Sequence, residues 1–343
     1  MNDTFLKVCR GEKVSYTPIW IMRQAGRYLP EYQEIRKRVD FLTLCKDPDL
    51  ASEVTIQPVE ILGVDAAILF SDILIPLEPM GIDLEFSEKI GPIINNPVRD
   101  KASFDNLLSY NPDDELDFVK KTIKNLKSNL KVPLIGFSGA PFTLATYLIE
   151  GGTSKNFINT KKLMYGDRVL FEEIMAKLTI MIHDYLLMQI KAGVDAIQIF
   201  DTWLGIVCPE YILKYILKYV NKLIDNIKSN SNVPIIYFPF NCSYILKQIS
   251  GVSADVIGID WRIYIDNASE LMNNQKTIQG NLDPCVLFAT RDIIKQNVEM
   301  VLNRGVACKG HIFNLGHGIL PETPVDNVKY FVDIVHKLSQ KGD

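Results

Sequence analysis

Two arginines four residues apart, Arg23 and Arg27, follow an apolar run in the segment MRQAGRYLP, residues 22–30. A guanidinium group stays charged at every relevant pH, and its rigid fork of donors matches a carboxylate or a phosphate. The pair therefore predicts that an anion binds at the end of a buried strand. The alternative is that both arginines form surface ion pairs with Glu31 or Glu34.

A single carboxylate, Asp72, lies inside the otherwise apolar stretch AAILFSDILI, residues 66–75. Because burying an unpaired charge is costly, Asp72 needs a partner. That partner is either a backbone N–H group or positive charge that develops on a ligand, the mirror image of an oxyanion hole. Both interpretations stay open from the residues alone.

Three more polar side chains have a possible role in chemistry. Tyr147 lies on a predicted helix that follows a Gly-Ala-Pro turn, and it could equally be a packing residue. Thr202 offers a small hydroxyl that could bind a ligand or cap a helix. His317 stands between Gly316 and Gly318, which leave its ring room to project, although a lone histidine is as often structural.

Eight short apolar runs, rich in β-branched and aromatic residues, are typical of strands buried on both faces. They are residues 19–22, 65–70, 133–137, 195–200, 234–238, 256–260, 276–280 and 311–315. Helical patterns separate most of them, at residues 167–192, 209–228, 266–274, 291–303 and 325–338. This alternation predicts an α/β fold with a parallel sheet, either a closed (β/α)8 TIM barrel or a doubly wound open sheet. We favour the barrel.

The region 76–130 breaks this rhythm with several prolines and glycines. We interpret it as an excursion between strands two and three, so that residues 1–343 form a single barrel domain. In such a barrel the chemistry lies at the carboxyl ends of the strands. The candidate side chains named above follow predicted strands one, two, three, four and eight, and we therefore expect them to converge.

The composition limits the classes of partner. The 343 residues are 47% apolar and 23% charged, which is typical of a globular protein. The formal net charge of −4 argues against nucleic acid or an anionic membrane as partner, so local charge must bind any anion. No uncharged apolar stretch approaches the ~20 residues of a membrane span.

The six cysteines have neither C-x-x-C spacing nor a neighbouring histidine, so we predict reduced thiols, no metal site and an intracellular protein. Residues 1–13 look like neither a secretory signal nor an obvious transit peptide. We expect the cytoplasm, with the plastid stroma as the alternative if a transit peptide was removed.

Seven motifs in order along the chain resemble the uroporphyrinogen decarboxylase family. They are MRQAGRYLPEY, AAILFSDIL, IGFSGAPFTLATYLIEGG, IFDTWLG, GIDW, QGNLDP and NLGHGI. The resemblance implies a (β/α)8 barrel, a homodimer with facing clefts, and neither metal nor cofactor. It also implies a carboxy-lyase of haem and tetrapyrrole biosynthesis. Such an enzyme removes four carboxyl groups from the acetate side chains of uroporphyrinogen III, a cyclic tetrapyrrole, to give coproporphyrinogen III.

The resemblance also implies which residues contact the substrate, with Arg23, Arg27 and Asp72 as the catalytic ones. The full set is Arg23, Gln24, Ala25, Gly26, Arg27, Asp72, Tyr147, Thr202 and His317. One stretch departs from the family, because FPFNCS at residues 238–243 replaces a turn that commonly contains lysine and glycine.

The chemistry of the implied reaction suits these residues. Loss of CO₂ from an acetate needs an electron sink, and a pyrrole protonated on a ring carbon provides one without a cofactor. Arg23 and Arg27 would hold carboxylates, and Asp72 would bind the pyrrole N–H groups. Arg27, Tyr147 and His317 are unranked candidates for positioning or for proton relay.

Two alternatives use the same barrel. A corrinoid- or zinc-dependent methyltransferase-like relative predicts bound zinc, against which the scattered cysteines argue. A non-catalytic tetrapyrrole-binding protein predicts tight binding without release of CO₂.

Overall fold

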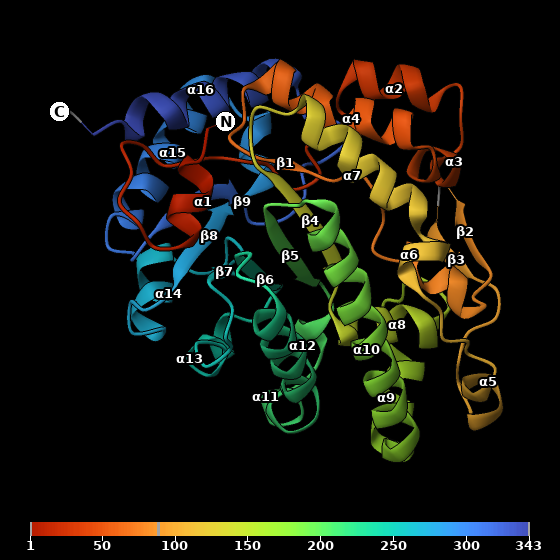
Figure 1. Cartoon of the computed structure of the whole chain (residues 1–343). Coiled ribbons are helices and arrows are strands. Elements are labelled where there is room, and N and C mark those ends of the chain that lie inside the picture. Colours follow the sequence, from red (N-terminus) through yellow and green to blue (C-terminus); the bar gives the residue numbers. More distant parts are fainter. Residues whose placement is uncertain (1, 88–89, 342–343) are drawn as a thin grey trace.

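The computed structural model describes residues 2–87 and 90–341, and its centre is a curled sheet of seven parallel strands. Their order is β1-β4-β5-β6-β7-β8-β9 (Figure 1). The strands are β1 (Ala67–Ile68), β4 (Leu134–Gly139), β5 (Ala196–Asp201), β6 (Ile235–Pro239), β7 (Val256–Gly258), β8 (Thr277–Leu282) and β9 (His311–Leu315). The predicted α/β fold with a parallel sheet is confirmed.

The first predicted strand, residues 19–22, is wrong as a regular strand, because it is reduced to one parallel bridge between Ile19 and Phe313. Around this bridge Phe313 N–H donates to the Pro18 carbonyl (2.8 Å), and Asp65 N–H donates to the Ile19 carbonyl (2.7 Å). The segment therefore joins β9 to the residues just before β1 and closes the sheet into a barrel. It ends early because the backbone N–H groups of Ile21 and Met22 donate to side chains, to Gln24 Oε1 at 3.1 Å and to Asn314 Oδ1 at 3.0 Å, instead of to a neighbouring strand.

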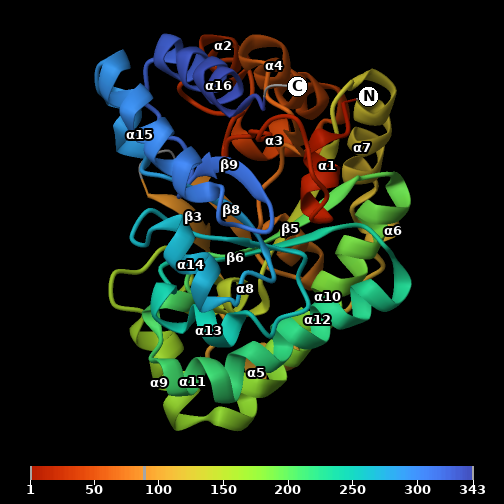
Figure 2. The same cartoon turned by 90° about the vertical axis from the view of Figure 1, so that its left-hand side faces the viewer.

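Long helices cover the outside of the sheet (Figures 1 and 2). They are α4 (Pro48–Leu62), α7 (Asp117–Asn129), α10 (Arg168–Ala192), α12 (Leu217–Asn230), α15 (Arg291–Gly305) and α16 (Val325–Ser339), with the shorter α14 (Ile265–Leu271). The helix predicted at 167–192 is confirmed as α10. The helix predicted at 209–228 is interrupted, because α11 (Pro209–Tyr211) and a π-helical turn, η3 (Ile212–Ile216), precede α12.

Shorter elements occupy the connections. They are α1 (Thr4–Cys9), α2 (Pro30–Arg36), α3 (Phe41–Lys46), α5 (Lys101–Asp105), α6 (Pro112–Glu115), α8 (Pro141–Glu150), α9 (Ile158–Gly166), α13 (Leu246–Ile249), and the 3₁₀ turns η1 (Ile75–Met80), η2 (Leu204–Ile206), η4 (Ser243–Ile245) and η5 (Pro284–Phe288). An antiparallel pair, β2 (Leu84–Ser87) and β3 (Gly91–Ile94), lies in the chain between β1 and β4. A bridge between Ile93 and Gly152 attaches this pair to the end of α8.

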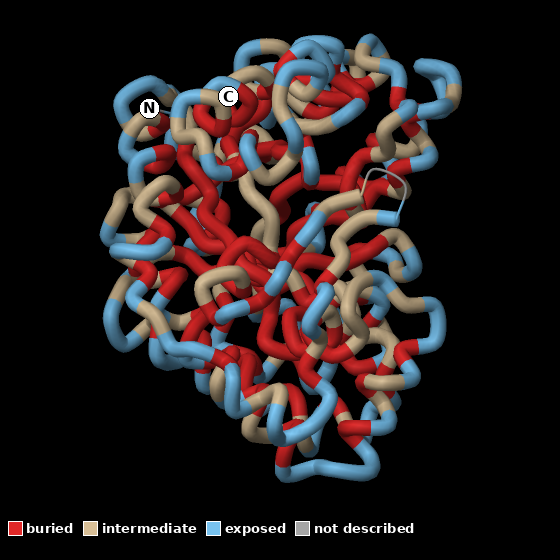
Figure 3. Tube along the Cα trace, turned by 90° about the vertical axis from the view of Figure 1, so that its right-hand side faces the viewer, coloured by how far each residue is buried: buried red, intermediate tan, exposed pale blue. Residues whose placement is uncertain are grey.

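The sheet separates two hydrophobic cores. The inner core fills the barrel with side chains of several strands, such as Ile236 and Ile312, and Phe5 and Val8 of α1 belong to it. The outer core lies between the sheet and the helices. Figure 3 shows the buried chain concentrated in the middle of the molecule. The barrel is therefore a packed core and not a pore, and ligands must bind at one of its ends.

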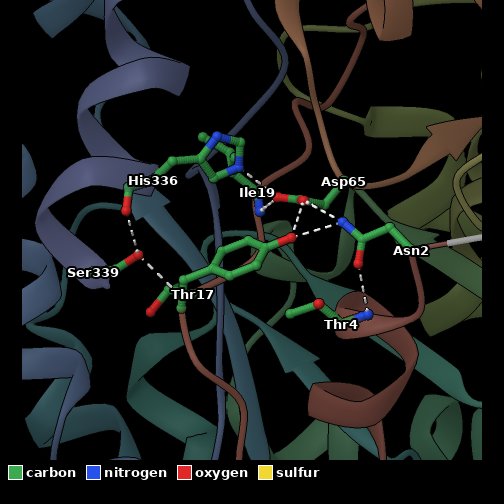
Figure 4. A network of polar contacts seen from close by, with 8 residues as sticks. Asn2, Thr4, Thr17, Ile19, Asp65, His336 and Ser339 are labelled. Carbon is green, nitrogen blue, oxygen red and sulfur yellow. Dashed lines mark hydrogen bonds and ion pairs between the residues drawn. The ribbon is translucent and has the colours of Figure 1, made fainter. Parts of the chain in front are cut away.

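At the amino ends of the strands, an aspartate binds the neighbouring strand through both its backbone and its side chain. Asp65 N–H donates to Ile19, and the Asp65 carboxylate accepts the Ile19 N–H group at 2.8 Å (Figure 4). The same carboxylate lies 2.8 Å from His336 Nε2 and accepts hydrogen bonds from Tyr16 (2.7 Å) and Asn2 (3.1 Å). It thereby joins α16 and the first residues to the barrel.

Two further aspartates repeat this arrangement. Asp195 exchanges N–H···O bonds with Leu134 (2.8 Å each way), and Asp255 does so with Ile235 (2.9 Å each way). The lysines that neutralise them are Lys127, 2.6 Å from Asp195, and Lys228, 2.7 Å from Asp255. We call Asp65, Asp195 and Asp255 the three base aspartates, because they lie at the base of the barrel, opposite the carboxyl ends of the strands. They satisfy edge N–H groups that the short strands would otherwise leave unpaired.

Replacing Asp65 by alanine should destabilise the protein. The change leaves the Ile19 N–H group unsatisfied, so we expect a loss of about 2–4 kcal/mol in the free energy of unfolding. Urea unfolding would measure the loss. Asp333→Ala, on the exposed side of α16, is the control and should stay within about 0.5 kcal/mol. Equal losses in the two variants would contradict the role of Asp65.

Candidate active site

Several of the predicted candidates lie at the carboxyl end of the barrel, which we call the mouth. Arg23 follows the closing bridge, Asp72 follows β1, and His317 follows β9. The charge of Arg23 acts on the pKa values of three other candidates, namely Asp72, Tyr147 and His317. Side chains from four distant parts of the chain therefore share one electrostatic environment.

The two glycines around His317 let its neighbours approach. A Cβ atom on Gly318 would overlap Arg23 Cδ and lie 2.9 Å from Arg23 Cγ and Nε. A Cβ atom on Gly316 would lie 2.7 Å from the Trp261 backbone nitrogen. The Arg23 side chain thus packs against Gly318 of the His317 loop, and the segment around Trp261 packs against Gly316.

His317 is half-buried, and its ring centroid lies 4.6 Å from that of Phe240. Burial, together with the positive charges of Arg23 and Arg262, lowers the pKa of His317 to about 4. The imidazole is therefore neutral at neutral pH and can both donate and accept hydrogen bonds.

Asp72 is half-buried, and burial raises its pKa to about 6 against the opposing effects of a hydrogen bond and of Arg23. Its Oδ1 accepts the Leu74 N–H group at 2.9 Å. Within the described residues this is the carboxylate's one hydrogen bond, which leaves Oδ2 available to a ligand. The backbone partner expected for Asp72 is present, and it does not saturate the carboxylate.

Tyr147 and Thr202 line the region around Trp203. The Tyr147 and Trp203 rings are 5.8 Å apart, and burial, followed by the Asp72 charge, raises the pKa of Tyr147 to about 12. The phenol is therefore a hydrogen-bond donor at neutral pH. Thr202 is half-buried, and Trp203 rather than Thr202 stands at the start of η2, so the capping alternative for Thr202 is wrong.

Buried Asp201 holds this region in place. Its carboxylate accepts the Tyr237 hydroxyl at 2.7 Å and the Thr143 hydroxyl at 2.9 Å. The hydroxyl oxygen of Thr143 in turn accepts the backbone N–H group of Trp203 at 3.3 Å. Burial raises the pKa of Asp201 to about 6, and its two hydroxyl partners oppose this rise. The end of β5 is therefore fixed by side-chain hydrogen bonds, which position its neighbour Thr202.

The side chain of Gln24 has a structural role. The amide is fully buried, accepts the Ile21 N–H group at 3.1 Å and donates to the Ala66 carbonyl at 3.1 Å. It ties the arginine turn to the residues that lead into β1, so the side chain predicted to contact a ligand is already engaged. Ala25 and Gly26 are half-buried and offer only backbone groups for hydrogen bonding.

Arg27 is exposed and differs from Arg23 in its surroundings. Burial raises the pKa of Tyr32 to about 12, and the Arg27 charge opposes this rise. Arg27 is not among the charges that lower the pKa of His317. Neither arginine forms an ion pair with Glu31 or Glu34 within the described chain, so the surface ion-pair alternative is wrong. The structure thus links Arg23, but not Arg27, to the Asp72–His317 group.

Comparison with known proteins gives the family. The family model described as uroporphyrinogen decarboxylase (URO-D) matches residues 1–338. The chain belongs to the uroporphyrinogen decarboxylase family. A relative of that name from Carboxydothermus hydrogenoformans is 50% identical over 341 residues, covering 99% of this chain and 97% of the relative. Another, from Desulfotalea psychrophila, is 51% identical over 341 residues, covering 99% and 100%.

Among solved structures, a methyltransferase from Methanosarcina mazei superposes with a TM-score of 0.81 at 19% identity, covering 98% of both chains. At this identity the likeness shows the shared fold alone. Within residues 2–87 and 90–341, no group of three or more His, Cys, Asp or Glu side chains is placed to hold a metal ion. No helix in the same residues is long and apolar enough to cross a membrane.

Two mouth residues were not among the predicted substrate contacts, Phe240 and Arg262. Residues 238–243, the segment expected from the sequence to depart from the family, bring Phe240 against His317. Arg262 lies over the Phe240 ring at 5.1 Å and over the Trp261 ring at 4.4 Å. The signal for Arg262 was present, because it follows β7 at its carboxyl end as Arg23 follows the closing bridge.

The two arginines of the turn should differ in their effect on His317. Because the Arg23 charge lowers the pKa of His317, Arg23→Met should raise that pKa above about 4, whereas Arg27→Met should leave it unchanged. NMR titration of the histidine ring protons, assigned with a His317→Gln variant, measures both. A rise in Arg27→Met equal to that in Arg23→Met would show that the two charges are equivalent.

Proposed function

We propose that this protein removes the four acetate carboxyl groups of uroporphyrinogen III and releases coproporphyrinogen III, and that the mouth is where it does so. The assignment rests on relatives named uroporphyrinogen decarboxylase that are 50% and 51% identical to this chain and cover 99% of it. The gathering of Arg23, Asp72, Tyr147 and His317 supports the choice of site.

Each of the four steps exchanges one carboxylate for hydrogen. A proton adds to a ring carbon of the pyrrole, the C–C bond to the carboxylate breaks, and CO₂ leaves while its bonding electrons neutralise the ring cation. The resulting exocyclic methylene takes a proton to become a methyl group, and the ring carbon loses its added proton. One proton is consumed for each CO₂. The protein must therefore bind a polyanion, stabilise a ring cation and exchange protons.

Arg23 is suited to bind carboxylates because it is exposed at the mouth and has no ion-pair partner within the described chain. Its fork of donors fits a carboxylate in two parallel hydrogen bonds. Arg27 is a candidate for a carboxylate farther out on the same turn. The rim of the substrate carries eight carboxylates, so several such contacts can form at once.

Asp72 is suited to stabilise the ring cation. Its free Oδ2 can accept pyrrole N–H groups, whose positive charge increases in the transition state. With a pKa of about 6 it is mostly ionised at neutral pH. A neighbouring ring cation would lower this pKa and keep the carboxylate charged during the reaction.

Tyr147 and His317 have complementary proton states. Tyr147 keeps its proton at neutral pH, whereas His317 is neutral in the free protein. Bound carboxylates would offset the charges of Arg23 and Arg262 and so raise the pKa of His317. The histidine can thus take up a proton once substrate is bound, and it is our first choice for the proton relay.

We further propose a homodimer with facing mouths, a cytoplasmic location, and residues 1–343 acting as one catalytic domain. Family membership supports the first two of these, and the relatives compared are bacterial proteins, which lend no support to the plastid alternative.

Replacing Asp72 by asparagine should reduce turnover about a hundred- to a thousandfold, because it removes the charge opposite the ring cation. Anaerobic incubation with uroporphyrinogen III, followed by chromatography of the oxidised products, measures turnover. Asp333→Asn on the exposed side of α16 is the matched control and should keep full activity. A loss below about threefold in Asp72→Asn would exclude this role, and binding without any CO₂ release by the unaltered protein would favour a tetrapyrrole carrier.

The acid side of the pH profile should report the ionisation of Asp72. As pH falls through the Asp72 pKa of about 6 the carboxylate gains a proton, so kcat/KM should fall about tenfold between pH 7 and pH 5. The residual activity of Asp72→Asn should lack this decrease. If the variant keeps the same acid limb as the unaltered protein, another group is responsible.

A further inference from the structure

Arg262 presents a second guanidinium near the His317 loop, in addition to that of Arg23. Trp261, the residue before it, packs against Gly316, and Arg23 packs against Gly318. Both arginines act on the pKa of His317. The two positive charges therefore both lie near the histidine at the mouth.

Asp260 fixes the backbone of Arg262 and leaves most N–H donors of the guanidinium without a partner in this contact. The buried carboxylate accepts the backbone N–H groups of Arg262 (2.9 Å) and Asn241 (2.8 Å). Its contact with the guanidinium is a single ion pair, from Arg262 Nη1 to Asp260 Oδ2 at 3.3 Å. A guanidinium has five N–H donors, so most of them stay available. The Arg262 side chain is 43% exposed and can meet a ligand.

Two aromatic rings restrict the orientation of the guanidinium. Arg262 stacks on Trp261 at 4.4 Å and on Phe240 at 5.1 Å, and Phe240 also contacts His317. Such stacking fixes the plane of an arginine before a ligand arrives, which reduces the entropy lost on binding. Segment 238–243 thus supplies Phe240, one of the two rings over which Arg262 lies.

We propose that Arg262 binds a side-chain carboxylate of the polycarboxylate substrate and, together with Arg23, sets which pyrrole ring faces Asp72. This inference rests on the proposed function. A tetrapyrrole held at one carboxylate only could rotate in the mouth. A second carboxylate bound by Arg262 restricts that rotation. Arg262 is therefore a specificity residue for highly carboxylated substrates.

The chain contains a matched control. Arg304 also lies over an aromatic ring, that of Tyr264 at 3.8 Å, and pairs with an aspartate, Asp266, at 2.7 Å. It belongs to the end of α15, and its charge is not among those that act on His317. Arg304→Met therefore removes the same local interactions as Arg262→Met without removing a mouth charge.

The test is anaerobic steady-state kinetics of Arg262→Met, Arg262→Lys and Arg304→Met with uroporphyrinogen III and with the pentacarboxylate intermediate, which keeps one acetate. We expect Arg262→Met to raise KM for uroporphyrinogen III about tenfold, the scale of one lost charge-assisted hydrogen bond, with kcat within about twofold. The rise should be smaller for the pentacarboxylate. Arg262→Lys keeps the stem and charge, so it should raise KM only about two- to threefold, and Arg304→Met should not change it.

Thermal unfolding of each variant accompanies the kinetics. An unchanged KM in Arg262→Met, or a KM change that Arg304→Met reproduces, overturns the inference while leaving the proposed function intact. If Arg262→Met does not fold, Arg262→Lys decides, and an unchanged KM there overturns the inference. Failure of the unaltered protein to form coproporphyrinogen would instead refute the proposed function, and this inference with it.

Discussion

The mouth depends on the closure of the sheet between the two ends of the chain. Because Phe313 donates its N–H group to Pro18, the turn that carries Arg23 is fixed beside the loop that carries His317. Ile319 N–H donates to the Met22 carbonyl at 3.0 Å and continues this connection past the last strand. Without the closure, residues at opposite ends of the sequence would lie at opposite edges of an open sheet.

The same closure gives the mouth its charge pattern. Burial penalises every charged form, so it raises the pKa of Asp72 and lowers that of His317. Arg23 opposes the first effect and adds to the second. The free protein therefore presents a carboxylate at the mouth with guanidinium groups and a neutral imidazole. This pattern complements a macrocycle with N–H groups inside and carboxylates outside.

Sequence periodicity predicted the elements whose pattern is set by burial alone. The apolar spacing of α10 and the glycine after it gave that helix almost to the residue, and most strands were found. The first strand failed as a regular strand because side chains of Gln24 and Asn314, and not a neighbouring strand, accept the N–H groups of Ile21 and Met22. Which strand ends carry polar groups was predictable. The burial of Gln24 and the stacking of Arg262 on Phe240 were not, because they depend on packing between segments far apart in sequence.

The three base aspartates have a consequence for how the ring is built. Each aspartate joins a strand to the preceding one in the chain. The joined residues are 46 positions apart for Asp65, 61 for Asp195 and 20 for Asp255. The bridge between Ile19 and Phe313, in contrast, spans almost the whole chain. The entropy lost on joining two points of a chain grows only with the logarithm of their separation. The last connection therefore costs about 2 kcal/mol more than the Asp65 connection. A circular sheet is thus only slightly harder to assemble than a linear one whose neighbouring strands are already paired.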